Sequence, residues 1–461
     1  MTSLAFESIT SIAMMIRDGR TSAVDITQLM LNRIEKFDGR LNAFITVMAE
    51  SALCEARQAD EELSSGTDRG LLHGIPIAVK DLIATQGVRT TGGSKLYEQW
   101  VPDEDAAVVR KLREAGAVII GKTGLHELAY GTTSKNEWFG DVRNPRALDH
   151  IAGGSSGGSA AAVTAGLAYA AIGTDTGCSI RQPAHCCGIV GHKPTYGLVS
   201  KHGVIPLVYS MDHVGPLARS VKDTAIVLDA IAGFDPQDPR SIKSQQTVFS
   251  SDTNTALQTL RIGVVRRFFF DGDRQVVSVV DDTLEHLSSL GAQIIELDIP
   301  EIEQVSEASR ILFLEALTIY EDALNDTPDV FGAEVRGKLE ASRNISATSY
   351  AAAREYQLSF RQRIDQLMTD CDFLCAPTST ASAVPLDNIQ DGFARHAWKN
   401  TCVFDFTGQP SISIPCGATP TGLPVGMMLT GKFDQDAKLL EQAREIETVL
   451  SEFEPPTLFR S

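Results

Sequence analysis

The sequence has 461 residues, of which 43% are hydrophobic and 22% are charged, and its formal net charge at pH 7 is −18. The hydrophobic and charged fractions are near those of globular proteins, so we expect a large folded core and little disorder. The net negative charge argues against a nucleic-acid surface, which needs clustered Lys and Arg. No apolar run reaches the roughly 18 residues that a membrane span requires, so no membrane association is expected.

The N-terminal segment and the cysteines indicate a cytoplasmic location. Glu7 interrupts the first apolar stretch, and no basic segment precedes it, which is typical of an amphipathic helix and not of a signal peptide. The eight cysteines are scattered, and Cys186 and Cys187 are adjacent. This spacing fits neither a disulfide framework nor a zinc site, so we expect reduced thiols and no bound metal, although His185 and His192 lie nearby.

Helical and strand patterns alternate along the chain. Helices are predicted over residues 1–18, 21–37, 49–63, 105–115, 123–130, 160–167, 221–232, 275–290 and 434–450, and over most of 302–370. Strands are predicted over residues 74–80, 117–120, 169–172, 260–265, 373–376, 411–415 and 425–429, and residues 131–150 are predicted to form a long loop. This alternation predicts an α/β fold, an α/β/α sandwich around a large mixed β-sheet.

Two glycine- and serine-rich loops are the candidates for a functional site. Residues 153–159 read G-G-S-S-G-G-S, and residues 173–184 read G-T-D-T-G-C-S-I-R-Q-P-A. Glycine lets backbone amides approach a ligand closely, and serine is a candidate nucleophile once a base activates it.

Motif spacing alone leaves several interpretations of the first loop. A phosphate-binding P-loop fails because no lysine follows Gly158, and the glycine order does not match a dinucleotide fingerprint. A G-x-S-x-G nucleophile elbow does fit, with Ser156 at its centre. It needs a downstream acid and histidine, and His213, His286 and His396 stand in no suggestive context. A purely structural glycine turn is the remaining interpretation.

A further interpretation combines both loops with Lys80, which ends the apolar segment 74–80. The motifs that support it are G-I-P-I-A-V-K-D, A-G-A-V-I-I-G-K-T, W-F-G-D-V-R-N-P, G-G-S-S-G-G-S-A-A-A-V, T-D-T-G-C-S-I-R-Q-P-A and G-H-K-P-T-Y-G. In this order the set resembles the amidase signature family, from about residue 74 to residue 215, with weaker similarity through D-H-V-G-P-L-A-R and G-Q-P-S-I-S-I-P. The resemblance implies one amidase domain over residues 1–461. It divides into N-terminal helices (1–70), the signature core (71–232), a linker-like loop (233–259) and a second half (260–461) that completes the sheet and the substrate pocket.

The resemblance implies a Ser–Ser–Lys catalytic triad. Ser179 matches the nucleophile of the family, Ser155 matches the bridging serine, which follows a cis peptide bond, and Lys80 matches the base. An amine of a lysine titrates near 10.4 in water, and burial lowers that pKa toward neutrality. A neutral Lys80 could then accept the proton of Ser155, and Ser155 that of Ser179.

Further roles follow from the same resemblance. The backbone amides of Thr176, Gly177, Cys178 and Ser179 match the oxyanion hole, and Ala129 lies where the family contacts bound substrate.

Three more positions are assigned to structural support: Ser156, Asp175 and Arg181, the last two as an ion pair. Cys178 departs from the family, which usually has glycine there. If that position requires a positive φ, its Cβ would strain the oxyanion loop by about 1 kcal/mol or more.

The implied function is hydrolysis of a carboxylic amide, or of a related urea-type C–N bond, through an acyl-enzyme and without a cofactor. One alternative is the glutamine-hydrolysing subunit of a tRNA-dependent amidotransferase, which would need partner subunits. Another is a non-catalytic family member, suggested by Cys178. The expected partner is a small-molecule amide, with no direct contact to nucleic acid or membrane, and a homodimer stays open.

Overall fold

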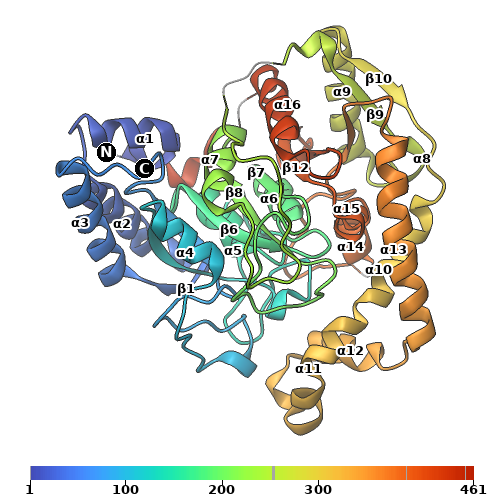
Figure 1. The fold of residues 1–461 in the computed structure, drawn as a ribbon, viewed down its shortest axis with the longest axis horizontal. Coiled ribbons are helices and arrows are strands. Elements are labelled where there is room, and N and C mark those ends of the chain that lie inside the picture. The colour runs from blue at the N-terminus through green and yellow to red at the C-terminus, as the bar shows by residue number, and fades with distance from the viewer. Residues whose placement is uncertain (1, 252–254, 391, 452, 461) are drawn as a thin grey trace.

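The computed structural model describes residues 2–251, 255–390, 392–451 and 453–460 (Figure 1). Within these ranges, eleven strands form one mixed sheet in the order β1-β3-β2-β6-β8-β7-β12-β13-β11-β9-β10. Its strands are β1 (Phe44–Val47), β2 (Pro76–Lys80), β3 (Val118–Thr123), β6 (Ala170–Asp175), β7 (Val190–Lys193), β8 (His213–Ala218), β9 (Arg261–Val264), β10 (Gln293–Glu296), β11 (Phe373–Pro377), β12 (Ser411–Ala418) and β13 (Pro424–Thr430). A separate hairpin pairs β4 (Arg143–Asn144) with β5 (Ala147–Ile151).

Helices cover both faces of the sheet, so the predicted α/β/α sandwich is confirmed. They are α1 (Ile9–Arg17), α2 (Ala23–Leu41), α3 (Ala49–Ser64), α4 (Ala107–Glu114), α5 (Gly157–Thr164), α6 (Arg181–Cys187), α7 (Val221–Ile231), α8 (Arg266–Phe269), α9 (Arg274–Ser289), α10 (Ile302–Leu312), α11 (Leu314–Asp326), α12 (Ala333–Ser342), α13 (Ala347–Leu367), α14 (Phe393–Trp398), α15 (Cys402–Thr407) and α16 (Asp436–Val449). None of the helices in the described part of the chain is long and apolar enough to cross a membrane.

The two halves of the chain share the sheet. Strands β1 to β8 come from the part before residue 219 and β9 to β13 from the part after residue 260, and β7 pairs with β12 where they meet. The linker-like loop expected over residues 233–259 contains no helix or strand through residue 251, and its residues 252–254 lie outside the described ranges. The loop therefore connects two halves of a continuous sheet, and Asp235 and Asp238 bind Ser200 and the amide of Lys201 in the first half.

Helix α5 is buried along its whole length and packs beside β6. Its small residues permit this close approach. A Cβ placed on Gly158 would lie 2.4 Å from the carbonyl oxygen of Gly124 and 2.6 Å from that of Ala43, distances that no side chain tolerates. The N-terminal end of α5 therefore lies directly against the core, next to the ends of β2 and β6.

Two local predictions were wrong. The helix expected over residues 123–130 is only a 3₁₀ turn, Glu127–Ala129, because β3 extends through Thr123 and Leu128 and Ala129 have left-handed φ angles of 49° and 59°. The long loop expected over residues 131–150 contains most of the β4–β5 hairpin. In this part of the chain, contacts with other segments determine the secondary structure. Local sequence propensity carries no information about those contacts.

Candidate active site

Lys80 lies at the C-terminal end of β2 and is fully buried. Its Nζ donates to Ser155 Oγ at 2.7 Å and to Thr174 Oγ1 at 2.8 Å. Strands β2 and β6 are parallel neighbours, so their C-terminal ends bring Lys80 and Thr174 to the same edge of the sheet. Ser155 comes to this edge from the loop before α5, and the Gly154–Ser155 peptide bond is cis.

Burial lowers the pKa of Lys80 from 10.5 to about 7. The charges of Asp175 and Asp212 act in the opposite direction and do not cancel that effect. At neutral pH a large fraction of Lys80 is therefore the free amine. In that form its lone pair can accept a proton from the hydroxyl of Ser155 at hydrogen-bond distance.

Ser179 lies in the loop between β6 and α6 and lines a cavity of about 400 Å³. Its carbonyl oxygen accepts a hydrogen bond from the amide of Ser156 at 3.2 Å, which joins the two serine-containing loops. In the described structure its Oγ makes no hydrogen bond to Ser155, so the contact that proton transfer requires is not closed. Such contacts commonly tighten only when substrate is bound.

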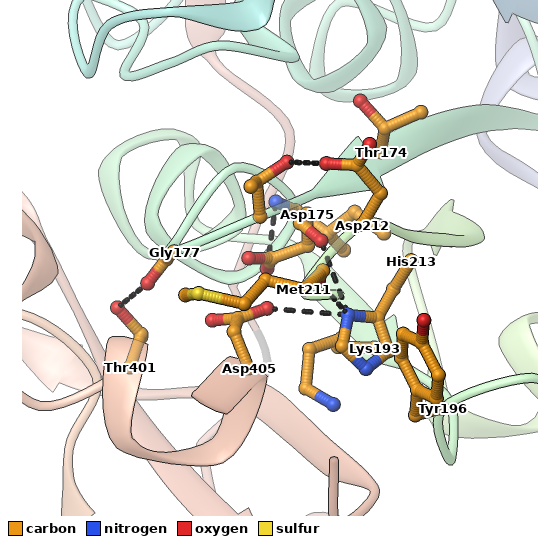
Figure 2. Close-up of polar contacts among 12 residues, drawn as sticks. Thr174, Asp175, Gly177, Lys193, Tyr196, Met211, Asp212, His213, Thr401 and Asp405 are labelled. Atoms are coloured by element: carbon orange, nitrogen blue, oxygen red, sulfur yellow. Dashed lines mark hydrogen bonds and ion pairs between the residues drawn. The ribbon is translucent and has the colours of Figure 1, made fainter. Parts of the chain in front are cut away.

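The backbone of residues 176–179 has free donors. In the described part of the chain, the amides of Thr176, Gly177, Cys178 and Ser179 donate to no protein group. Neighbours fix this loop (Figure 2): Thr176 Oγ1 donates to Asp212 at 2.6 Å, and Thr401 Oγ1 donates to the carbonyl of Gly177 at 2.6 Å. Preorganised amides beside Ser179 can bind an anionic oxygen that forms on a carbonyl attacked there.

Known proteins resemble this chain in sequence and in fold. The family model described as Amidase matches residues 25–440. The chain belongs to the amidase family. The family named from the sequence motifs is therefore confirmed, and the Amidase match extends well beyond the motifs themselves.

Individual members of the amidase family resemble the chain over nearly its whole length. The A subunit of glutamyl-tRNA(Gln) amidotransferase from Koribacter versatilis is 37% identical, over 95% of this chain and 97% of that protein. The solved structure of the A subunit of glutamyl-tRNA(Gln) amidotransferase from Thermotoga maritima has a TM-score of 0.80 at 32% identity, with 94% of each chain covered. The native peptide amidase from Stenotrophomonas maltophilia has a TM-score of 0.85 at 32% identity, covering 97% of this chain and 98% of that one.

A buried ion cluster lies beside the loop of residues 176–179. Arg181 Nε donates to Asp175 at 3.0 Å, and its other arm pairs with Asp405 from α15. Burial alone would raise the pKa of Asp175, but Arg181 holds it at about 2. Asp405 keeps a pKa well above its usual value, because burial outweighs the attraction of Arg181. His213 contacts the same cluster (Figure 2), with Nδ1 at 3.4 Å from Asp405.

We expect Arg181→Met to destabilise the protein by about 3–5 kcal/mol, because it leaves buried carboxylates without their cation. Denaturant unfolding measures the change. Arg343 is a control, since its pair with Glu321 is exposed and its replacement by Met should cost less than about 1 kcal/mol. Equal effects of the two substitutions would show that the buried cluster does not hold the fold together.

Cys178 does not strain the loop. Its φ angle is outside the left-handed region, so the condition under which a Cβ would be costly at this position is not met. Its Sγ lies 3.6 Å from the carbonyl oxygen of Gly154, and burial raises the pKa of the thiol well above its usual value. The thiol is therefore protonated, and the side chain fills space between the two loops.

For Cys178→Ala we expect kcat/KM on the amide substrate to stay within about threefold of wild type, because the donor at this position is the backbone N–H. Steady-state kinetics measures it. A loss of two orders of magnitude or more would mean that the sulfur itself takes part in the reaction.

Ser156 has a structural environment. Its Oγ donates to the carbonyl of Thr174 at 3.1 Å and accepts from the amide of Thr174 at 3.2 Å, and the side chain is fully buried. No histidine contacts it among the described residues, so a nucleophile elbow centred on Ser156 has no base. These bonds fix the start of α5 against β6 and so position the neighbouring Ser155.

The histidines and cysteines after the second loop hold the fold together. His185 Nδ1 accepts from the amide of Gly426 at 2.8 Å, and His192 Nε2 lies 3.2 Å from Asp436. Cys186 and Cys187 are buried free thiols. Across the described residues, no group of three or more His, Cys, Asp or Glu side chains could hold a metal ion.

Sequence reasoning missed several residues of the site. Thr174 accepts a hydrogen bond from Lys80, as Ser155 does. Its position in the T-D-T-G motif was the only feature of the sequence that indicated a role for it. Asp212 and Thr401 bind the loop of residues 176–179 from distant segments, and no feature of the sequence indicated either residue. Ala129, expected at the substrate, does line the cavity. Most of the remaining wall comes from the second half of the chain, including Phe313 and Trp398, which sequence patterns could not separate from core residues.

Proposed function

We propose that this protein hydrolyses a carboxylic amide with Ser179 as the nucleophile, Ser155 as the proton relay and Lys80 as the base. The observation that carries the proposal is the buried contact of 2.7 Å between Lys80 Nζ and Ser155 Oγ, beside a cavity that Ser179 lines. Because Ser155 contacts the base Lys80, it can pass its own proton to Lys80 and accept the proton of Ser179.

The proposed reaction runs in two halves. Ser179 Oγ attacks the amide carbon while its proton passes to Ser155 and the proton of Ser155 passes to Lys80. The amides of residues 176–179 stabilise the resulting oxyanion. Lys80 then returns a proton through Ser155 to the leaving amine as the C–N bond breaks. Water attacks the acyl-enzyme by the same route and releases the acid and free Ser179.

The pH dependence of kcat/KM should follow Lys80. Because the neutral amine is the active form, activity should rise with pH through the Lys80 pKa of about 7. It should fall about tenfold per pH unit below that value. Initial rates across buffers of constant ionic strength measure the profile. A flat profile between roughly pH 5 and pH 9 would rule out Lys80 as the base.

Release of ammonia or amine from a panel of amides tests the proposal directly. The panel should include aliphatic, aromatic and urea-type compounds, with Ser179→Ala as the blank. We expect release that depends on Ser179 from at least one class. Reaction of a fluorophosphonate with Ser179 distinguishes a catalytic protein from a non-catalytic family member, because only an activated serine reacts.

A second candidate is the glutamine-hydrolysing subunit of a tRNA-dependent amidotransferase. Its support is the naming of curated relatives at 36–38% identity over more than nine-tenths of this chain. Of the two activities, the relatives favour this one. It predicts weak glutaminase activity of the single chain and strong stimulation by partner subunits that co-purify from the native host. Light scattering of the purified single chain shows whether it is instead a homodimer. The amidase rate of the same sample shows whether the chain has full activity without partner subunits.

A further inference from the structure

Three aromatic side chains form one wall of the cavity above Ser179. Tyr130 stacks on Phe313 with ring centroids 5.1 Å apart, and Phe313 meets the edge of Trp398 at 6.2 Å. Leu207 and Ile345 add apolar surface. A cavity of this size and lining accommodates the flat or apolar body of a small molecule.

Cationic side chains also line this cavity, and two of them have no anionic partner at ion-pair distance among the described residues. Lys338 is already paired, because its Nζ donates to Glu334 at 2.6 Å and to the carbonyl of Tyr130 at 2.7 Å. Arg310, at the end of α10, and Arg395, in α14, are exposed and make no side-chain hydrogen bond or ion pair with any described residue. The guanidinium of Arg310 lies 5.8 Å from the centroid of Trp398, the residue that also contacts Phe313.

No acidic side chain lines the cavity among the described residues. The charge of the cavity wall therefore determines which charged groups a substrate can carry. A carboxylate entering the cavity meets free guanidinium groups, which bind it with paired, charge-assisted hydrogen bonds. An ammonium group entering the cavity meets those same cations and no carboxylate of the cavity wall, and losing its hydration there is costly. The carboxylates of Asp271, Glu303 and Glu307 line the adjoining cavity, on the other side of the two arginines.

We infer that the substrate is an amide that carries a carboxylate and no ammonium group on an apolar body, and that Arg310 and Arg395 select it. This inference deepens the proposed hydrolysis at Ser179 and rests on it for the orientation of the substrate. The amide lies at Ser179, the apolar body contacts Phe313 and Trp398, and the carboxylate lies between the two arginines. Free glutamine, which carries an ammonium group, fits this arrangement less well.

Binding to Ser179→Ala tests the inference without turnover. Isothermal titration calorimetry compares 4-carbamoylbenzoate with 4-methylbenzamide, which differ only in the carboxylate. We expect the double substitution Arg310→Gln and Arg395→Gln to weaken binding of the carboxylate about 10- to 100-fold, the range for charge-assisted hydrogen bonds. Binding of the neutral amide should change by less than about twofold, because it makes no such bonds.

Two controls make the comparison specific. Arg20→Gln removes an exposed positive charge that does not line the cavity, and should leave both affinities unchanged. Replacing both arginines by lysine should restore part of the carboxylate affinity, since the charge returns without the planar fork. Equal weakening of both ligands, or weakening by Arg20→Gln as large as by the double substitution, would overturn the inference.

A second pair of ligands tests the exclusion of ammonium. Glutarate monoamide and glutamine differ only by the α-ammonium, and we expect the monoamide to bind more tightly. Glutamine binding as tightly as the monoamide would overturn the inference and favour the glutamine-hydrolysing role. If the arginines discriminate as expected but the wild-type protein hydrolyses none of these amides, the selection of carboxylate ligands by Arg310 and Arg395 stands, and the proposed hydrolysis at Ser179 fails.

Discussion

Ser179→Ala should reduce amide turnover by about 10⁴-fold or more while the protein stays folded, because it removes the only group that forms the covalent bond to substrate. The change deletes one hydroxyl that, within the described structure, makes no hydrogen bond to the backbone or to a charged group, so the free energy of unfolding should stay nearly constant. Ammonia release and denaturant unfolding, measured on the same preparation, separate the two effects.

Ser156→Ala is the matched control. It deletes a hydroxyl from the other glycine-rich loop, where both bonds of the side chain go to the backbone of Thr174. We expect a loss of stability of about 1–3 kcal/mol from the unsatisfied backbone groups. Turnover of the folded protein should fall far less than in Ser179→Ala, because the hydroxyl of Ser156 positions Ser155 and does not react. The opposite result, turnover lost with Ser156→Ala and kept with Ser179→Ala, would contradict the assignment of the nucleophile.

Lys80→Met should reduce turnover by about 10³-fold, within the range that a general base contributes. Methionine has nearly the same length and no charge, so it fills the buried space around Ser155 without a proton-accepting group. The remaining activity should also lose its inflection near pH 7, because the group that titrates there is gone. Rates measured as a function of pH give both results.

Lys122 provides the control for a buried lysine. It lies on β3 beside β2, is equally buried, and donates to the carbonyl of Ile83 and to Thr90. Burial lowers its pKa to about 8. Lys122→Met should destabilise the fold and leave Asp81 unpaired but retain the pH inflection of the folded protein. If both variants lose the inflection near pH 7, the inflection does not identify Lys80 as the base.

The sequence predicted most of the sheet and the residues brought together at its edge. Segments 74–80 and 169–172 correspond to β2 and β6 because continuous apolar runs are typical of strands buried on both faces. Strand β8 was not predicted, because His213, Gly215 and Pro216 interrupt the apolar pattern that is typical of a buried strand. Helix α6 was missed for a similar reason, because it contains Pro183 and two cysteines.

Part of the candidate site was also predicted from the sequence, and part was not. Lys80 and Ser155 were named from sequence motifs, and the structure places their side chains in contact. The residues that surround the cavity come from segments without a recognisable pattern. Arg310 and Phe313 are far from Arg395 in the chain, and all three are ordinary in their local context. Only the packing of α10 and α14 over the second loop gives these residues a common surface, and packing between distant segments leaves no periodic signal.

Lys80 is proposed to activate Ser179 through Ser155. Reaction with a fluorophosphonate, followed by peptide mapping in a mass spectrometer, measures that activation. We expect one adduct, on Ser179. Its rate of formation should rise with pH through about 7 and fall at least about 100-fold in Lys80→Met, the lower limit for loss of a general base. An adduct on Ser155 or Ser156, or labelling of Ser179 at the same rate in Lys80→Met, would contradict it.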